Sequence, residues 1–431
     1  MTGRHPNRFF SHLILTILLT CSGIWTPGQT LDNQNSLALI GGTVYVNPMD
    51  APIHEGVIVI REGKIVAVGR KRSVRIPPDS REIDCSGLII TAGFWNSHVH
   101  FFERKWAKAD SIPATELAQQ IQDAFTRFGF TSVFDLSSEW VNTKRIRERI
   151  ESGEVSGPKI YSTGEGLIPP GAMPSDAVLN FMGLMKTRNP EIGDETQAVA
   201  ESKRLLAEGV AGLKLFASSQ SGTPMSETAI RAITAEAHKL GKPVFVHPNS
   251  GADILVAIRN GVDVIAHTTP RSGPWDAKVL DSMKAAAVAL TPTLTLWAFY
   301  LRHERVSTRS QIVNAALGQL RSWSTAGGVV LFGTDLGAVD PDPTEEYILM
   351  SHAGMSFRQI LASLTTAPAV KFGQAAQVGR IAVGLQADLV VLNQDPAKDI
   401  RSLASVKYTL RAGKIIYQAT PDKNLKLTSN R

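Results

Sequence analysis

The sequence predicts an α/β protein: a (β/α)8 TIM-like barrel with a small β-sandwich domain formed by both ends of the chain. Apolar, strand-like segments alternate with amphipathic helices through the middle of the chain, whereas both flanks contain short β-rich runs. The 431 residues suffice for one large barrel and a companion domain. With 43% apolar and 19% charged residues, the composition excludes a largely disordered chain.

The two flanks share the same sequence pattern, in which short β-rich runs alternate with turns. The first contains the runs LALIGGTVYV, GVIVIREGKIVAVG and REIDCSGLII, with hairpin-type turns at Gly41-Gly42 and Glu62-Gly63. The far end repeats this style in Gly379–Leu392 (GRIAVGLQADLVVL) and Val406–Tyr417 (VKYTLRAGKIIY). We therefore expect residues 37–90 plus 379–420 to form one composite β-sandwich domain.

Between the flanks, residues 91–378 are expected to form the barrel. Amphipathic helices are predicted at Pro113–Phe128 and Ser226–Leu240. Eight apolar strands separated by helices match the count of a (β/α)8 barrel. The predicted strands are 93–100, 130–136, 159–164, 211–216, 243–247, 262–267, 287–293 and 328–335.

Residues 1–28 have the pattern of an export signal peptide. Arg4 and Arg8 precede the short apolar run Leu13–Leu19, and a polar, turn-prone stretch follows. The run is far shorter than the roughly 20 residues that span a bilayer, so no stable membrane span is expected. The prediction is a periplasmic or secreted protein. Lipid attachment at Cys21 is the weaker alternative because Thr20 is a poor residue before such a cysteine.

Charge and cysteine content exclude several classes of protein. Removing Arg4 and Arg8 with the signal lowers the net charge from +6 to +4. No basic run with interleaved aromatic residues occurs, so nucleic acid is not an expected partner. Loss of Cys21 leaves Cys85, in a strand-like stretch, as a buried small hydrophobe, and a disulfide scaffold is excluded.

Polar residues at the carboxyl ends of the predicted strands indicate a metal site. His98 and His100 lie two apart on the first strand, so their side chains point to the same side. Further polar residues follow other apolar strands, at the face where barrel enzymes build active sites: Lys214, His247, His267 and Asp335. Burying such groups together is costly unless something pairs them. Imidazole and carboxylate ligands favour a divalent metal, Zn²⁺ first, with Fe, Mn or Co as alternatives.

At this point the sequence resembles the amidohydrolase superfamily, in its imidazolonepropionase-like and Xaa-Pro dipeptidase-like branch. The runs GGTVYV and GKIVAVG resemble the opening strands of that family, and TAGFWNSHVH resembles its first-strand motif. LASLTTAPAVKFG followed by VGRIAVGLQADLVVLNQDP resembles its C-terminal passage. The order H-x-H, Lys, His, His, Asp is reproduced. Asn96 stands where the family usually has an aspartate.

The resemblance implies a role for each residue. His98 and His100 would bind the more buried ion together with Asp335, and His247 and His267 the second. A carbamylated Lys214 would bridge the two ions. A metal-activated hydroxide would attack the scissile carbonyl. Asp335 would carry the proton to the departing nitrogen.

The expected function is hydrolysis of carbon–nitrogen (but not peptide) bonds in a small amide or cyclic amide. The expected partners are this small molecule and further copies of the chain in a homo-oligomer. An Xaa-Pro-type dipeptidase or carboxypeptidase is the first alternative. A deaminase ranks lower because HPNSGAD after the fifth strand offers no glutamate. A non-catalytic metal-binding protein ranks lower because Asp335 is present.

Three further residues near strand ends are weaker candidates for the site: Asp135, Tyr161 and Glu165. For Asp135, capping of the next helix or an ion pair is the favoured interpretation.

Overall fold

The computed structural model describes residues 36–172, 185, 189–219, 222–419 and 425–426. The predicted export signal, residues 1–28 with Cys21, lies outside these residues. Within the described ranges, none of the helices combines the length and the apolar character that a membrane crossing requires.

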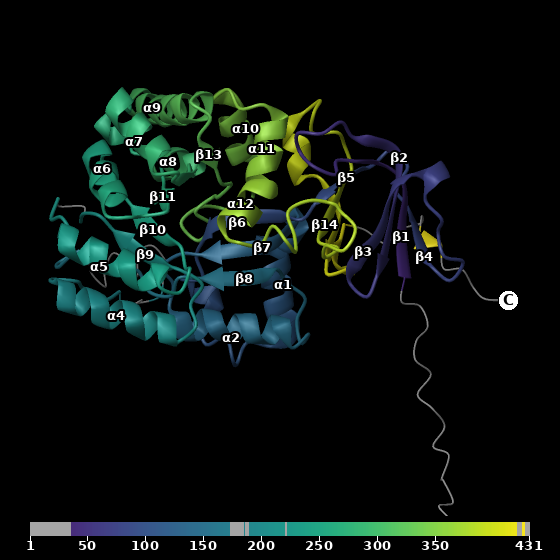
Figure 1. The fold of residues 1–431 in the computed structure, drawn as a ribbon, viewed down its shortest axis with the longest axis horizontal. Helices are drawn as coiled ribbons and strands as arrows, with labels where there is room; N and C mark the ends of the chain where they lie inside the picture. The colour runs from purple at the N-terminus through teal and green to yellow at the C-terminus, as the bar shows by residue number, and fades with distance from the viewer. Residues whose placement is uncertain (1–35, 173–184, 186–188, 220–221, 420–424, 427–431) are drawn as a thin grey trace, which may run out of the picture. The chain divides into compact units, whose positions relative to one another are not determined.

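Eight parallel strands form the central part of the chain (Figure 1). One sheet has the order β6-β7-β8 and the other the order β13-β12-β11-β10-β9. Each strand lies inside a range that the sequence predicts, and several are shorter because the chain turns away in left-handed conformations just after them. Their bounds are β6 Phe94–Val99, β7 Phe130–Asp135, β8 Lys159–Ser162, β9 Leu213–Phe216, β10 Val244–His247, β11 Val264–Ala266, β12 Ala289–Thr291 and β13 Val329–Val330.

Backbone hydrogen bonds connect these two sheets along both edges. Beside β8, the amide of Ala211 donates to the carbonyl of Ser162 at 2.7 Å. Beside β6, the amide of Ser97 donates to the carbonyl of Phe332 at 2.7 Å. These are contacts that the predicted barrel requires at the two edges.

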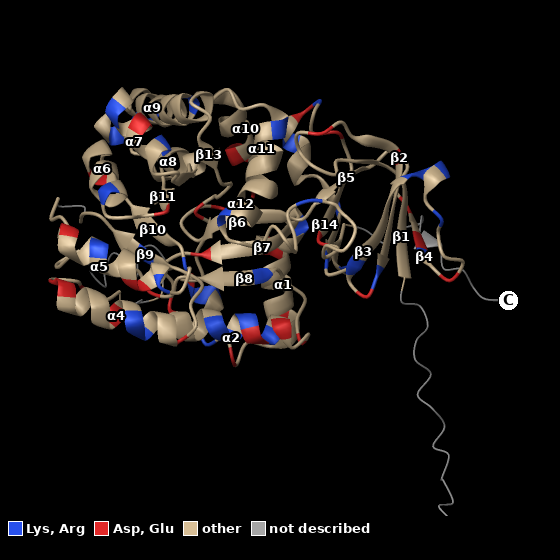
Figure 2. Ribbon diagram, viewed as in Figure 1, with Lys and Arg blue, Asp and Glu red and all other residues tan. Residues whose placement is uncertain are grey.

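Helices follow the strands and cover them. The predicted helix Ser226–Leu240 is observed as α5, which begins after Ser226 because that side chain accepts a hydrogen bond from the Ala229 amide at 3.2 Å. The α-helices are α1 Ala114–Ala124, α2 Trp140–Glu151, α4 Glu195–Ala207, α5 Glu227–His238, α6 Gly251–Arg259, α7 Ala277–Ala285, α8 Leu294–Tyr300, α9 Val306–Thr325, α10 Thr344–His352, α11 Phe357–Leu364 and α12 Thr366–Lys371. Short 3₁₀ helices occupy Lys71–Ser73, Arg104–Trp106, Thr126–Phe128, Pro270–Ser272 and Ile400–Ala404. Figure 2 shows both signs of charge interspersed on α2 and α4.

Both ends of the described chain meet in one nine-stranded sheet, drawn in purple and yellow in Figure 1. Its main path is β16-β15-β14-β5-β1-β2-β3, and β4 joins it through β1 while β17 joins through β4. C-terminal β14 therefore pairs directly with N-terminal β5. The bounds are β1 Ser36–Val44, β2 Ile53–Arg61, β3 Lys64–Arg70, β4 Arg81–Asp84, β5 Ile89–Ala92, β14 Leu389–Leu392, β15 Val406–Arg411, β16 Lys414–Gln418 and β17 Leu425–Lys426.

An apolar cluster lies between the parallel strands. Phe134 of β7 and Phe245 of β10 are buried there with their ring centroids 4.7 Å apart. Phe372, just after α12, packs against both rings and against Trp95 of β6.

Candidate metal centre

The polar residues predicted for the site are placed by the alternation of side chains along strands. In β9, Leu213 and Leu215 pack into the outer hydrophobic core, so Lys214 between them points to the other side. In β10, His247 lies two residues after the inward Phe245 and shares its face. The carboxyl ends of parallel strands meet at one edge, which brings these side chains together.

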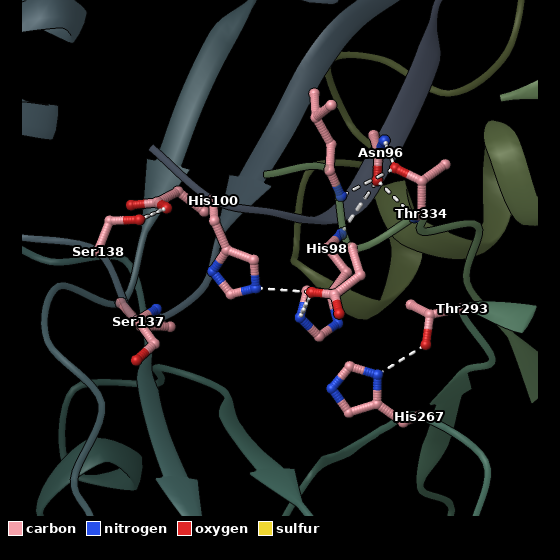
Figure 3. Close-up of polar contacts among 12 residues, drawn as sticks. Asn96, His98, His100, Ser137, Ser138, His267, Thr293 and Thr334 are labelled. Atoms are coloured by element: carbon pink, nitrogen blue, oxygen red, sulfur yellow. Dashed lines mark hydrogen bonds and ion pairs between the residues drawn. The ribbon is translucent and has the colours of Figure 1, made fainter. Parts of the chain in front are cut away.

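Asp335 lies between the two histidines of the H-x-H motif. Its Oδ1 atom is 2.7 Å from Nε2 of His100 and 3.1 Å from Nε2 of His98. All three side chains are buried. Figure 3 shows His98 and His100 arriving from the same strand and turned toward this common point.

His267 connects the H-x-H pair to the fifth strand. Its ring centroid lies 4.6 Å from that of His98 and 4.6 Å from that of His247. Among the described residues, one group of three side chains brings potential ligand atoms within 4.8 Å of one another: His98, His267 and Asp335. The imidazoles therefore form a continuous cluster.

Several residues beside this cluster have left-handed backbone conformations that are uncommon for residues other than glycine. The φ angles are 80° at His267, 64° at Asp335, 45° at Thr293 and 73° at Ser137. Each residue comes shortly after one of the parallel strands. Such conformations cost free energy and persist where the surrounding structure imposes them, which is frequent at functional sites.

Asn96 joins the H-x-H strand to the segment that carries Asp335. Its Oδ1 accepts hydrogen bonds from the amides of His98 and Thr334, each at 3.2 Å, and its Nδ2 donates to Thr334 Oγ1 at 2.8 Å (Figure 3). The amide therefore performs a structural role at the position where the family usually has an aspartate.

The pKa values of the histidines are lowered, chiefly because burial disfavours their charged forms. The pKa of His98 is lowered to about 4 and that of His247 to about 3, and that of His267 lies well below its usual value. Burial alone would raise the pKa of Asp335, but the neighbouring His98 and His100 hold it well below its usual value. Neutral imidazoles and an ionised carboxylate are the forms that bind metals.

Lys214 is buried with 1% of its surface exposed, and burial lowers the pKa of its amine to about 7. Its Nζ atom has no hydrogen-bond partner among the described residues. An unpaired ammonium at this depth is costly, whereas a neutral amine is far less so. A neutral amine is also the form that reacts with CO₂ to give a carbamate.

The donor set fits a divalent transition metal. Besides Lys214 Nζ, the Nδ1 atoms of His98 and His100 are buried without a hydrogen-bond partner in the described part of the chain. Buried polar atoms normally have partners. Clustered nitrogen donors with one carboxylate are the ligands that Zn²⁺ and its neighbours in the first transition row prefer.

The structure brings all six predicted site residues to this edge, but the weaker candidates have other contacts. Asp135 is buried and accepts hydrogen bonds from Ser138, from Ser162 and from the Phe101 amide just after the H-x-H motif. Burial raises the pKa of its carboxyl group.

Tyr161 stacks on Trp95, with ring centroids 5.1 Å apart, and packs in an apolar cluster with Trp95 and Phe372. Glu165 accepts a hydrogen bond from the amide of Trp140 at the start of α2 and lies 3.7 Å from Arg204. The interpretation of these two as substrate-facing residues has no support in these contacts.

Sequence reasoning missed Thr293, whose Oγ1 lies 2.7 Å from Nδ1 of His267. A hydroxyl residue at the end of the predicted seventh strand, 287–293 (TPT), was the available signal. Glu346 accepts a hydrogen bond from the amide of Leu294, just after Thr293. It lies in an ordinary helical segment, and no sequence pattern indicated a role for it.

Comparison with known proteins identifies the class. Residues 89–416 match the amidohydrolase family. The chain belongs to this family, whose members are typically dependent on divalent metals, and it is a hydrolase.

The chain is similar to proteins with several different enzyme names. The chain is 23% identical to ochratoxinase from Aspergillus niger over 411 residues, covering 84% of this chain and 83% of the relative. It is 25% identical to imidazolonepropionase from Symbiobacterium thermophilum over 392 residues, covering 80% and 85%. A solved Xaa-Pro dipeptidase with methionine bound in its active site has the same fold, with a TM-score of 0.76, 21% identity, and coverage of 89% of this chain and all of that one.

Proposed function

We propose that this protein is a metal-dependent hydrolase that cleaves a carbon–nitrogen bond in a small amide or cyclic amide. The convergence of four histidines, Lys214 and Asp335 at one edge of the parallel strands carries this proposal. The Nζ atom of Lys214, buried without a hydrogen-bond partner in the described part of the chain, supports metal binding. The family membership supports hydrolysis.

Six residues would hold the metal. His98, His100 and Asp335 would bind one ion, and His247 with His267 would bind a second. Carbamylation of Lys214, in which the neutral amine adds CO₂ and releases one proton, would supply a bridging anion. We propose Zn²⁺ on the basis of the nitrogen-rich donor set. When bound, the metal supplies Lewis acidity and lowers the pKa of water.

Asp335 would move the proton. It is buried and held as a carboxylate, and its Oδ1 atom is fixed by Nε2 of His98 and Nε2 of His100. The carboxylate can accept a proton from the attacking water and return it to the departing nitrogen. This transfer leaves the aspartate as it began.

Two phenylalanines would contact apolar parts of the substrate. Phe102 stacks on His100 with ring centroids 4.3 Å apart, and Phe216 stacks on His247 at 4.9 Å. Both side chains are only partly buried. They flank the metal ligands and would exclude water from the scissile bond.

Metal analysis of the purified protein followed by a hydrolysis screen tests the proposal. We expect stoichiometric transition metal and turnover of N-acyl amino acids or cyclic amides. Absence of bound metal after loading with Zn²⁺ would refute the metal site, and metal without turnover of any amide would favour the non-catalytic alternative.

The same screen separates the second candidate, an Xaa-Pro dipeptidase or carboxypeptidase, which the likeness to a solved Xaa-Pro dipeptidase favours. Cleavage of Xaa-Pro dipeptides with no cleavage of other amides would support this candidate. A Lys214→Ala variant that keeps two ions and full activity would refute the bridging carbamate.

We further propose that the two parallel sheets form the closed (β/α)8 barrel over residues 91–378, and that residues 37–90 plus 379–420 form the composite domain. The backbone hydrogen bonds at both edges support the first, and pairing of β5 with β14 supports the second. We also propose export to the periplasm or medium, on the pattern of residues 1–28. Cell fractionation with N-terminal sequencing tests it.

A further inference from the structure

Helix α8, which follows the seventh parallel strand, is capped at its start by a residue from another helix. Glu346 of α10 is fully buried. Its Oε1 accepts a hydrogen bond from the amide of Leu294 at 2.9 Å. Its Oε2 accepts hydrogen bonds from the amide of Thr295 at 2.7 Å and from the hydroxyl of Thr295 at 2.8 Å. Both carboxylate oxygens are thus used on the first turn of α8.

The residue that would ordinarily cap this helix has a different contact. Thr293 occupies the N-cap position of α8, and threonine there usually accepts a hydrogen bond from an amide of the first turn. Its side chain makes no such bond. Instead its Oγ1 lies 2.7 Å from Nδ1 of His267 (Figure 3).

The contact fixes the orientation of the His267 ring, and the tautomer decides which group donates, because the Thr293 hydroxyl can donate or accept. A proton on Nδ1 donated to Thr293 Oγ1 leaves the lone pair of the other ring nitrogen, Nε2, available to a metal. In Figure 3, Thr293 lies on one side of the ring, and the remaining ring nitrogen lies on the opposite side. The backbone of Thr293 has a φ of 45°, so this position must be held by its surroundings.

Resting on the proposed function, we infer that Glu346 is a positioning residue for the metal site. It caps α8 in place of Thr293, which frees the Thr293 hydroxyl to hold His267 with Nε2 directed toward the metal. Removing either group would loosen the same ligand. Partners of this kind commonly change metal affinity by about 10- to 100-fold.

The test measures the affinity of the whole protein for Zn²⁺ alone, by competition with a chromophoric chelator. Glu346→Gln replaces one acceptor oxygen with a donor and leaves an amide of the first turn unpaired. We expect its Zn²⁺ affinity to fall by about tenfold or more. Glu345→Gln, one residue earlier on the same helix, is the matched control and should bind like the wild type.

Thr293→Val provides a second, independent variant because it removes the hydroxyl and leaves the Glu346 cap in place. We expect a similar loss of affinity, and we expect the double variant to lose no more than about the larger single loss, since both act through His267. Independent, additive losses would instead indicate two unrelated structural effects and overturn the inference. If Glu346→Gln fails to fold, Thr293→Val with an unchanged Zn²⁺ affinity overturns it.

The outcomes distinguish this inference from the proposed function. A wild-type protein that binds no Zn²⁺ refutes the proposed function and the inference with it. A wild type that binds Zn²⁺, with Glu346→Gln and Thr293→Val binding equally well, refutes only the inference. Selective loss in both variants, with Glu345→Gln unaffected, supports it.

Discussion

Two groups of side chains between the parallel strands have opposite chemistry. In the first group, Phe134 and Phe245 pack with Phe372 in an apolar cluster. At the carboxyl ends, histidines, a lysine and an aspartate are buried together, and several neighbouring residues have left-handed backbones. Within β10 the change takes two residues, from Phe245 to His247. The apolar cluster therefore stabilises the fold, and the stable fold keeps buried polar groups together at the candidate site although their burial is unfavourable.

The largest expected effect concerns the rate of hydrolysis and the polar residues at the carboxyl ends of the parallel strands. Asp335→Asn should lower the rate of amide hydrolysis by about 10³-fold, since an amide neither accepts the proton nor supplies the charge beside His98 and His100. Steady-state kinetics on the metal-loaded protein measures this loss. Asp340→Asn, in the same loop and exposed, is the control. Equal turnover by Asp335→Asn and wild type would rule out the proton-transfer role.

The next largest effect concerns the free energy of unfolding and the apolar cluster. Phe134→Ala should lower the free energy of unfolding by about 3–4 kcal/mol, because it opens a cavity among packed aromatic rings. Urea unfolding measures this change. Zn²⁺ affinity of the folded variant should stay within about twofold of the wild type. A large loss of Zn²⁺ affinity would show that the apolar cluster and the metal site are not independent.

The smallest expected effect is a pH dependence of the free energy of unfolding, caused by His247 at the candidate site. Burial lowers the pKa of His247 to about 3, below its usual value near 6.5, so the unfolded chain binds a proton between these pH values that the folded chain does not. Stability present above pH 6.5 is therefore lost as the pH falls. Between pH 6.5 and 5 this residue should account for about 2 kcal/mol. Urea unfolding of metal-free protein should show a shallower loss in His247→Gln, and an equal slope would contradict the prediction.

The sequence was most informative where one local pattern determines the outcome. All eight parallel strands lie inside their predicted ranges, since each is an apolar run bounded by turn residues. The six candidate ligands were found because polar residues directly follow such runs. Their strand ends were less predictable: His267 and Asp335 have left-handed backbones, which the contacts of neighbouring strands impose.

Contacts between distant segments could not be predicted. Glu345 and Glu346 are identical side chains at neighbouring positions, and only the packing of α10 against α8 decides that Glu346 is buried on the first turn of α8. Tyr161 likewise comes from a strand near the site, but its side chain packs in the apolar cluster beside Trp95. Side-chain direction in so short a strand depends on register, which neighbouring strands set.

The pairing of β5 with β14 has a consequence for the order of events during synthesis. Until residues 389–392 have left the ribosome, β5 presents the unpaired backbone of the apolar segment IITA at the edge of the growing N-terminal sheet. Open, apolar strand edges pair readily with other chains. Chains that are nascent or truncated before residue 389 would therefore be prone to aggregate, and β14 covers this edge once it has been synthesised.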